Sequence, residues 1–172
     1  MDAVYGDRIT AGLITSNVDF GTATNREFDL YLLYSLDAGS DLTLDLAAWR
    51  YTYRHEYNAN YNEYMLGLHY RQGVANVWYA DDYAGAGGNQ FYYDAGITLP
   101  VTNEYSLQLH AGHTDCDAQV GVEDYSDYSL AILTKYVGFA FSLQASTTTG
   151  DHPGDSYDDK ALIRVSRSFA LF

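Results

Sequence analysis

The sequence is poor in cysteine, proline and basic residues, and it has no long apolar run. Its 172 residues include one cysteine, Cys116, and two prolines. A single cysteine excludes an internal disulfide, and it leaves an envelope protein and a cytosolic protein both open. No stretch of about 18 apolar residues occurs, which excludes a membrane-spanning helix. The length fits a single domain, residues 1–172.

Basic residues are outnumbered by acidic ones. Lysine and arginine total 9 against 23 aspartates and glutamates, a formal net charge of -14. Because a nucleic acid needs a basic surface to neutralise its phosphates, this balance argues against nucleic acid as a partner. The sequence holds no G-x-S-x-G, P-loop or dinucleotide-binding motif. We therefore predict a protein that is not an enzyme, with no catalytic residue, metal ligand or cofactor.

What the sequence has in abundance is tyrosine, 18 residues, and alternation between apolar and polar positions. The clearest stretch is Tyr125–Thr149. In its second half the apolar set is Phe139, Phe141, Leu143 and Ala145, and the opposite set is Ala140, Ser142, Gln144 and Ser146. A period of two is typical of a strand with one apolar face. Because Gly138 can adopt a positive φ, we predict a two-residue hairpin turn at Val137-Gly138.

Similar alternation recurs along the whole chain and predicts about ten strands. They are Asp7–Thr15, Asn25–Leu36, Asp41–Tyr53, Asn60–Arg71, Val74–Asp82, Gln90–Leu99, Glu104–Thr114, the two arms of Tyr125–Thr149, and Lys160–Phe169. Each has roughly ten residues, the length that a tilted strand needs to cross a membrane. Within Asp41–Tyr53 the aromatic residues Trp49, Tyr51 and Tyr53 interrupt the alternation, and we expect a β-bulge there.

The connections between these strands alternate strictly between short and long. The short ones are Asp37–Ser40, Gln72-Gly73, Val101–Asn103 and Val137-Gly138. The long ones are Ser16–Thr24, Arg54–Ala59, Tyr83–Asn89, Asp115–Asp124 and Gly150–Asp159. In an up-and-down sheet this order places every long loop at one end, which is typical of outer-membrane barrels. The sequence therefore predicts an all-β fold, an antiparallel up-and-down transmembrane β-barrel of about ten strands.

The two faces of the predicted strands differ in charge and in tyrosine content. We predict that the polar set lines the lumen: Asp29, Asp45, Glu63, His69, Arg71, Asp94, Gln108, His110, Lys135, Gln144 and Arg164. We predict that tyrosines near the strand ends of the apolar face form an aromatic girdle at the membrane interfaces: Tyr34, Tyr64, Tyr70, Tyr105 and Tyr128. The alternative is a soluble lipocalin-like ligand-binding barrel, with the apolar face turned inward.

Several short motifs occur in a fixed order along the chain. They are SNVDFG at residues 16–21, FDLY at 28–31, YNEY at 61–64, YADDY at 79–83, YSDYSL at 125–130 and RVSRSF at 164–169. This pattern resembles the Gcw_chp group, a proteobacterial outer-membrane family of unknown function, over nearly the whole chain. The resemblance implies a location in the bacterial outer membrane and contact with membrane lipid or detergent. It implies no activity.

The resemblance carries two further expectations. Members of the family usually have another strand pair before the SNVDFG motif, so this chain is expected to lack the first strand pair of a barrel of about twelve strands. A terminal phenylalanine resembles the signal read by the barrel-assembly machinery, which implies that machinery as a partner. Both Phe169, where family members tend to end, and Phe172 are candidates for this signal.

Charges of both signs on the polar face leave two functions open. In the first, a narrow lumen would form a channel for small polar solutes or cations. The excess of acidic residues would favour cations. Alternatively, salt bridges would plug the lumen, and the barrel would act as a structural or binding protein through its acidic outer loops. Those loops contain Asp115, Asp117, Glu123 and Asp124, and Asp151, Asp155, Asp158 and Asp159. Neither loop has the spacing of a known calcium loop.

Two other features do not indicate a metal or a nucleophile. His110 and His113 are three residues apart on a predicted strand. They therefore fall on opposite faces and are poor ligands for one metal ion. Cys116 is flanked by Asp115 and Asp117, which disfavours a reactive thiolate.

Overall fold

The computed structural model describes residues 2–19, 21, 26–149 and 159–167. Phe20, Asp151, Asp155, Asp158, Phe169 and Phe172, on which sequence predictions fall, lie outside these ranges. The strands are β1 Asp2–Tyr5, β2 Ile9–Asn17, β3 Arg26–Asp37, β4 Leu42–Tyr53, β5 Tyr61–Tyr70, β6 Gly73–Ala80, β7 Gln90–Pro100, β8 Tyr105–Cys116, β9 Tyr125–Tyr136, β10 Phe139–Thr148 and β11 Lys160–Ser166. Three 3-10 helices accompany them: η1 Tyr57–Ala59, η2 Tyr83–Gly85 and η3 Ala118–Val120.

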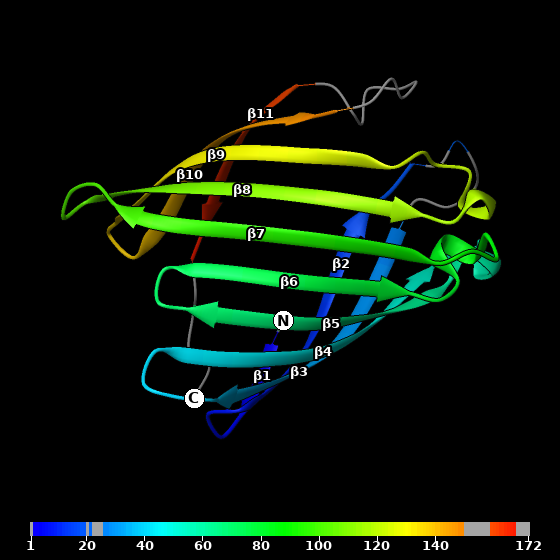
Figure 1. The fold of residues 1–172 in the computed structure, drawn as a ribbon, viewed down its shortest axis with the longest axis horizontal. Coiled ribbons are helices and arrows are strands. Elements are labelled where there is room, and N and C mark those ends of the chain that lie inside the picture. The colour runs from blue at the N-terminus through cyan, green and yellow to red at the C-terminus, as the bar shows by residue number, and fades with distance from the viewer. Residues whose placement is uncertain (1, 20, 22–25, 150–158, 168–172) are drawn as a thin grey trace.

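The strands form one 11-stranded sheet in sequence order, each antiparallel to the next (Figure 1). The predicted up-and-down antiparallel architecture is confirmed, and every predicted strand is present. β1 is not predicted from the sequence, because four residues are too few to show an alternation of apolar and polar positions. It pairs with β2, Asp2 opposite Gly12, and adds a short strand at the N-terminal edge.

Short turns and long loops lie at opposite ends of the sheet, as predicted. Turns at residues 6–8, 38–41, 71–72, 101–104 and 137–138 lie at one end (Figure 1). Loops at residues 54–60, 81–89 and 117–124 lie at the other end and contain η1, η2 and η3. In the part of the chain that the structure describes, no helix has the length and apolar character needed to span a membrane.

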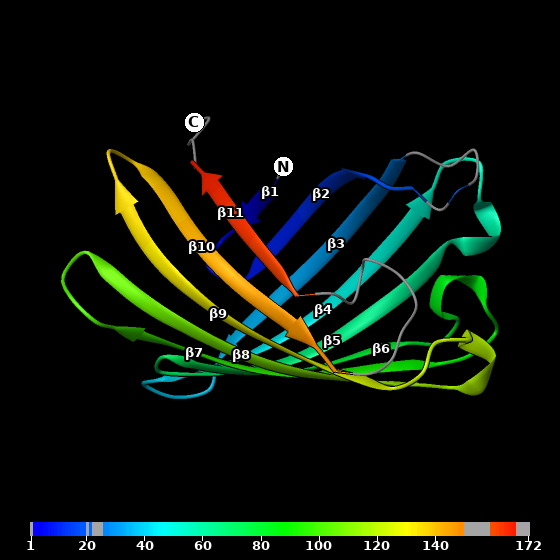
Figure 2. The same cartoon turned by 90° about the horizontal axis from the view of Figure 1, so that it is seen from above.

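The sheet curves into a trough that is open along one side (Figure 2). Its two edges are β1 and β11, and these two strands do not pair with each other among the described residues. The predicted barrel is thus present as a curved barrel-type sheet without closure. Ten antiparallel steps separate the two edges, so β1 and β11 run in the same direction.

The polar side chains occupy the inner face of the trough. Asp29 on β3 is 5% exposed, whereas the next residue, Leu30, is 58% exposed. Few apolar side chains are buried among the described residues: Ala47, Tyr53, Tyr61, Ala80 and Ala131. A lipocalin-like barrel would bury its aliphatic residues inside. The structure places them outside, so this alternative does not fit.

The predicted bulge near Trp49 is wrong. The register between β3 and β4 runs without interruption from Glu27 opposite Tyr53 to Asp37 opposite Thr43. Trp49, Tyr51 and Tyr53 therefore keep the parity of Asp45 and point to the inner face. The backbone of β4 therefore alternates regularly between the two faces. Only the polarity pattern changes, because the inner face carries aromatic residues near the loop end.

Two hairpin turns contain a non-glycine residue with a positive φ, which strains the backbone locally. At the predicted turn, Val137 and Gly138 have φ of 49° and 77°, and Tyr136 pairs with Phe139. The turn after β5 lies one residue earlier than predicted. Tyr70 pairs with Gly73, so Arg71-Gln72 form the turn, and Arg71 takes a φ of 55°.

Candidate functional site

The inner face brings together every predicted lumen residue except Arg71. The residues on this face are Asp29, Asp45, Glu63, His69, Asp94, Gln108, His110, Lys135, Gln144 and Arg164. Arg71 lies in the turn, where its Nε donates to Asp41 Oδ2 at 3.2 Å. The lumen-lining role of these residues stays a prediction, since the structure shows their positions and not a conducting path.

A hydrogen-bonded cluster surrounds Asp94 on β7. Asn76 Nδ2 donates to Asp94 Oδ1 at 2.9 Å, and Trp78 Nε1 donates to Oδ2 at 2.9 Å. His110 Nε2 lies 3.9 Å from Oδ1. The Asp94 carboxylate is therefore held on the inner wall by two hydrogen-bond donors on β6, Asn76 and Trp78, and His110 on β8 lies near it.

A second carboxylate, Asp127 on β9, is linked to the first through His110. Tyr92 OH donates to Asp127 Oδ2 at 3.1 Å, and His110 Nδ1 lies 3.3 Å from Oδ1. Sequence reasoning misses Asp127, although it has the same parity as Ser129 and Lys135 on the predicted polar face. The connection between Asp94 and Asp127 spans three strands, which no single strand reveals.

Buried polar atoms without partners lie further along the same face. His69 Nε2 lies 2.9 Å from Asp45 Oδ2. Within the described residues, Asp29 Oδ1, Asp45 Oδ1 and Trp49 Nε1 are buried and have no hydrogen-bond partner. Since such atoms are costly without a partner, water or a solute at this wall would stabilise them.

An aromatic ladder crosses the inner wall toward the loop end. Ring centroids are 4.4 Å apart for Tyr31 and Trp49, and 6.1 Å for Trp49 and Tyr51. They are 4.6 Å apart for Tyr51 and Tyr61, and 5.1 Å for Tyr61 and Tyr83 on η2. Offset ring pairs at such distances stabilise one another. The ladder therefore stiffens the wall between β3 and the loops.

The ladder ends in a cavity of about 450 Å³, here called the loop-end pocket. Five tyrosines and two carboxylates dominate its lining: Tyr51, Tyr61, Tyr83, Tyr92, Tyr125, Glu63 and Asp127. Tyr51 OH donates to Glu63 Oε2 at 2.9 Å. Burial raises the pKa of the Tyr83 hydroxyl to about 12, so this tyrosine is neutral at physiological pH.

The outer face carries the predicted girdle tyrosines at exposed positions. Tyr34, Tyr64, Tyr70, Tyr105 and Tyr128 all lie on this face. Toward the loop end, Phe91 adds a ring 4.9 Å from Tyr79 and 6.0 Å from Tyr93. Phe91 and Tyr93 alternate with Tyr92 and Asp94 along β7, and this alternation is the sequence signal that places them on the outer face. Tyr79 on β6 lies opposite Phe91 and shares that face.

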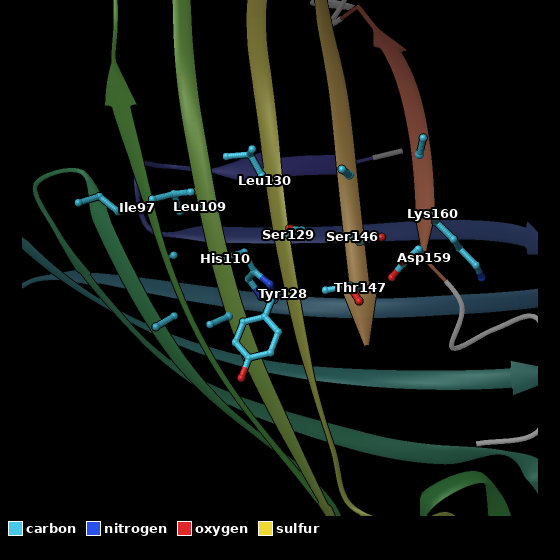
Figure 3. A pocket seen from close by; sticks show the side chains of 15 residues that line it. Ile97, Leu109, His110, Tyr128, Ser129, Leu130, Ser146, Thr147, Asp159 and Lys160 are labelled. Carbon is cyan, nitrogen blue, oxygen red and sulfur yellow. The ribbon is translucent and has the colours of Figure 1, made fainter. Parts of the chain in front are cut away.

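An apolar hollow of about 1080 Å³ lies over β7–β11. Ile97, Leu109 and Leu130 form one row across three strands (Figure 3). The row continues through the small residues Ala145 and Ala161. Short alanine side chains beside leucines leave the surface hollow, so the outer face is apolar and uneven here.

Several acidic residues of the described loops have protein partners. Asp117 Oδ2 accepts from Asn89 N at 3.0 Å, and Asp124 Oδ1 accepts from Cys116 N at 2.9 Å. Over residues 2–19, 21, 26–149 and 159–167, no three histidine, cysteine or acidic side chains gather as a metal site. His113 bonds Ser126 Oγ at 3.0 Å on the outer face, opposite His110, as their spacing predicts.

The antiparallel meander, the polar inner face and the exposed aliphatic outer face define a porin-like β-barrel architecture. The model of the Gcw_chp family, bacterial proteins of unknown function, matches residues 1–169. The chain belongs to this family, as its motifs predict.

Comparison with solved structures gives two outer-membrane porins, of which the first is similar in fold. A doubly substituted OccD1 (OprD) superposes with a TM-score of 0.50 at 13% identity, over 95% of this chain and 56% of that chain. OprD of Pseudomonas aeruginosa gives 0.49 at 12% identity, over 92% and 56%. This chain therefore spans about half the length of these structures. No curated protein matches the chain.

Proposed function

We propose that this protein is an outer-membrane β-barrel that forms a narrow channel for small polar solutes, with a preference for cations. The inner-face charge balance carries this proposal. From β3 to β9, the described inner-face carboxylates are Glu27, Asp29, Asp37, Asp45, Glu63, Asp94 and Asp127. Lys135 is the one lysine or arginine on that part of the face. An acidic wall attracts cations and repels anions.

The outer face supports the membrane part of the proposal. Leu66 and Leu143 are both 54% exposed, and many other aliphatic residues are exposed beside them. A soluble protein rarely leaves so large an apolar surface in water. Lipid or detergent covers this face in our proposal, with the girdle tyrosines at the interfaces. The barrel-assembly machinery is proposed to insert the chain, and the barrel catalyses no reaction.

A channel requires that the trough close. Direct pairing of β1 with β11 would be parallel, whereas bacterial outer-membrane barrels are antiparallel with an even number of strands. Closure therefore needs one further strand, or pairing of β11 with β2 after β1 moves aside. Both routes leave the acidic inner face unchanged.

The plugged barrel is the second candidate, and the cluster around His110 favours it. Asp94, His110 and Asp127 occupy the inner face between β7 and β9 with mutual contacts. Insertion of the refolded protein into a planar bilayer separates the two functions. Steady single-channel openings support the channel. A silent bilayer that contains folded, inserted protein contradicts it and leaves a plugged barrel that acts through its acidic outer loops.

A further inference from the structure

The loop-end pocket is lined by residues from different parts of the chain. Tyr51 and Tyr61 come from β4 and β5, and Tyr92 and Tyr125 come from β7 and β9. Tyr83 of η2 lies at the loop side. A volume of about 450 Å³ falls within the range of roughly 300–1,000 Å³ that is usual for small-molecule sites. A small organic molecule in the pocket would contact residues from several strands and from η2.

The charges that line the pocket are negative. Glu63 and Asp127 contribute carboxylates, and among the described residues no lysine, arginine or histidine lines the pocket itself, while His110 lies behind Asp127 with Nδ1 3.3 Å from Oδ1. Both carboxylates are partly buried. Since a partly buried carboxylate is stabilised by a nearby opposite charge, the pocket favours a cation and disfavours an anion.

The tyrosines determine what kind of cation fits. The face of an aromatic ring is negative and attracts an alkylated ammonium group. Tyr51 OH donates to Glu63, and Tyr92 OH donates to Asp127. A phenol that donates a hydrogen bond to a carboxylate gains electron density in its ring, which strengthens this attraction. A bare metal ion would gain less, because it prefers several oxygen ligands at fixed distances.

We propose that the loop-end pocket binds a small organic cation of the alkylammonium class, held by tyrosine ring faces and by Glu63 and Asp127. The binding does not require conduction, because the lining residues already lie together in the open trough. The expected ligand has an ammonium head with methyl or methylene groups around it. Binding would place such a solute at the loop end of the inner face.

Choline and its neutral isostere 3,3-dimethylbutan-1-ol test this proposal on the refolded, unmodified full chain. The two molecules share shape and hydroxyl group and differ in charge. Isothermal titration calorimetry in detergent should show choline binding about tenfold tighter than the isostere. Equal affinities, or no choline binding, would overturn the proposal. Displacement of choline by an equal concentration of potassium would also overturn it, because charge alone would then explain the binding.

Two pairs of variants distinguish the contributions that the tyrosine ring, its hydroxyl group and the carboxylate charge make to choline affinity. Tyr83→Phe keeps the ring and should leave choline affinity within about twofold, whereas Tyr83→Leu should weaken it about fivefold. Glu63→Gln should weaken choline binding, and Asp81→Asn in the neighbouring exposed loop should leave it unchanged. If Tyr83→Leu does not fold, the ligand pair and Glu63→Gln still decide. If the protein conducts ions but does not bind choline, this inference is contradicted and the proposal of a channel still stands.

Discussion

Asp45 and Leu46 are consecutive residues of β4 that meet opposite environments. Asp45 is 8% exposed on the inner face, and Leu46 is 54% exposed on the outer face. In a soluble protein the aspartate would face water and the leucine would be buried. Their inverted arrangement supports our proposal that lipid covers the outer face and that the inner face lines a polar path.

A charge at Leu46 tests where the lipid is. In lipid vesicles, Leu46→Arg should lower the free energy of unfolding by about 2–4 kcal/mol, because the arginine would enter hydrocarbon. The matched control is Tyr57→Arg on η1, a loop residue that is 72% exposed. It should change stability by less than about 0.5 kcal/mol. Equal, small effects of the two substitutions would place Leu46 in water.

The contact between Tyr92 and Asp127 is tested by a methyl group at Gly112. A Cβ at this position would collide with Tyr92 Oη and Asp127 Oδ2. We expect Gly112→Ala to lower stability by about 1–3 kcal/mol, since the hydrogen bond between these side chains would break. Gly73→Ala, whose Cβ would lie 3.5 Å from Tyr70 O, is the control and should be nearly neutral. Urea titration should show that Gly112→Ala is less stable than Gly73→Ala. Equal stability of the two variants would show that the cluster is loosely packed.

The hairpin turn between β9 and β10 offers a stabilising substitution. Val137 is β-branched and has a φ of 49°, a left-handed conformation that asparagine tolerates much better. Val137→Asn should raise the free energy of unfolding by about 1 kcal/mol. Gly138→Ala, at a φ of 77°, should lower it. A stability loss for Val137→Asn would mean that Val137, although 71% exposed, makes contacts with lipid that outweigh the backbone strain.

The architecture follows from the sequence because its signals are local and repeated. Alternating polarity and alternating loop length each recur in successive hairpins, so the existence and direction of ten of the eleven described strands follow without knowledge of distant contacts, and the four-residue β1 does not. The inner wall is harder to predict. Trp49 and Tyr51 combine an apolar ring with a polar group, so their residue types do not distinguish the two faces, and only the register with β3 does so.

The site residues that the sequence misses depend on contacts between strands. His110 contacts Asp94 on one neighbouring strand and Asp127 on the other. Arg71 is predicted on the inner face but lies in the turn, because the turn comes one residue earlier than predicted. A shift of one residue is enough to remove a side chain from its face. The loop-end pocket depends on η2, and nothing in the spacing of Tyr83 alone indicates that it meets Tyr61.

The most direct test of the central claim is the reversal potential of single channels in a potassium chloride gradient. We predict a cation-selective potential for the unmodified protein, and a shift toward zero in Glu63→Gln and Asp94→Asn, because each removes a carboxylate from the wall. Asp81→Asn, in an exposed loop, should keep the original potential. A nonselective or anion-selective channel, or unchanged potentials in both lumen variants, would contradict the proposal that the inner carboxylates line a conducting path.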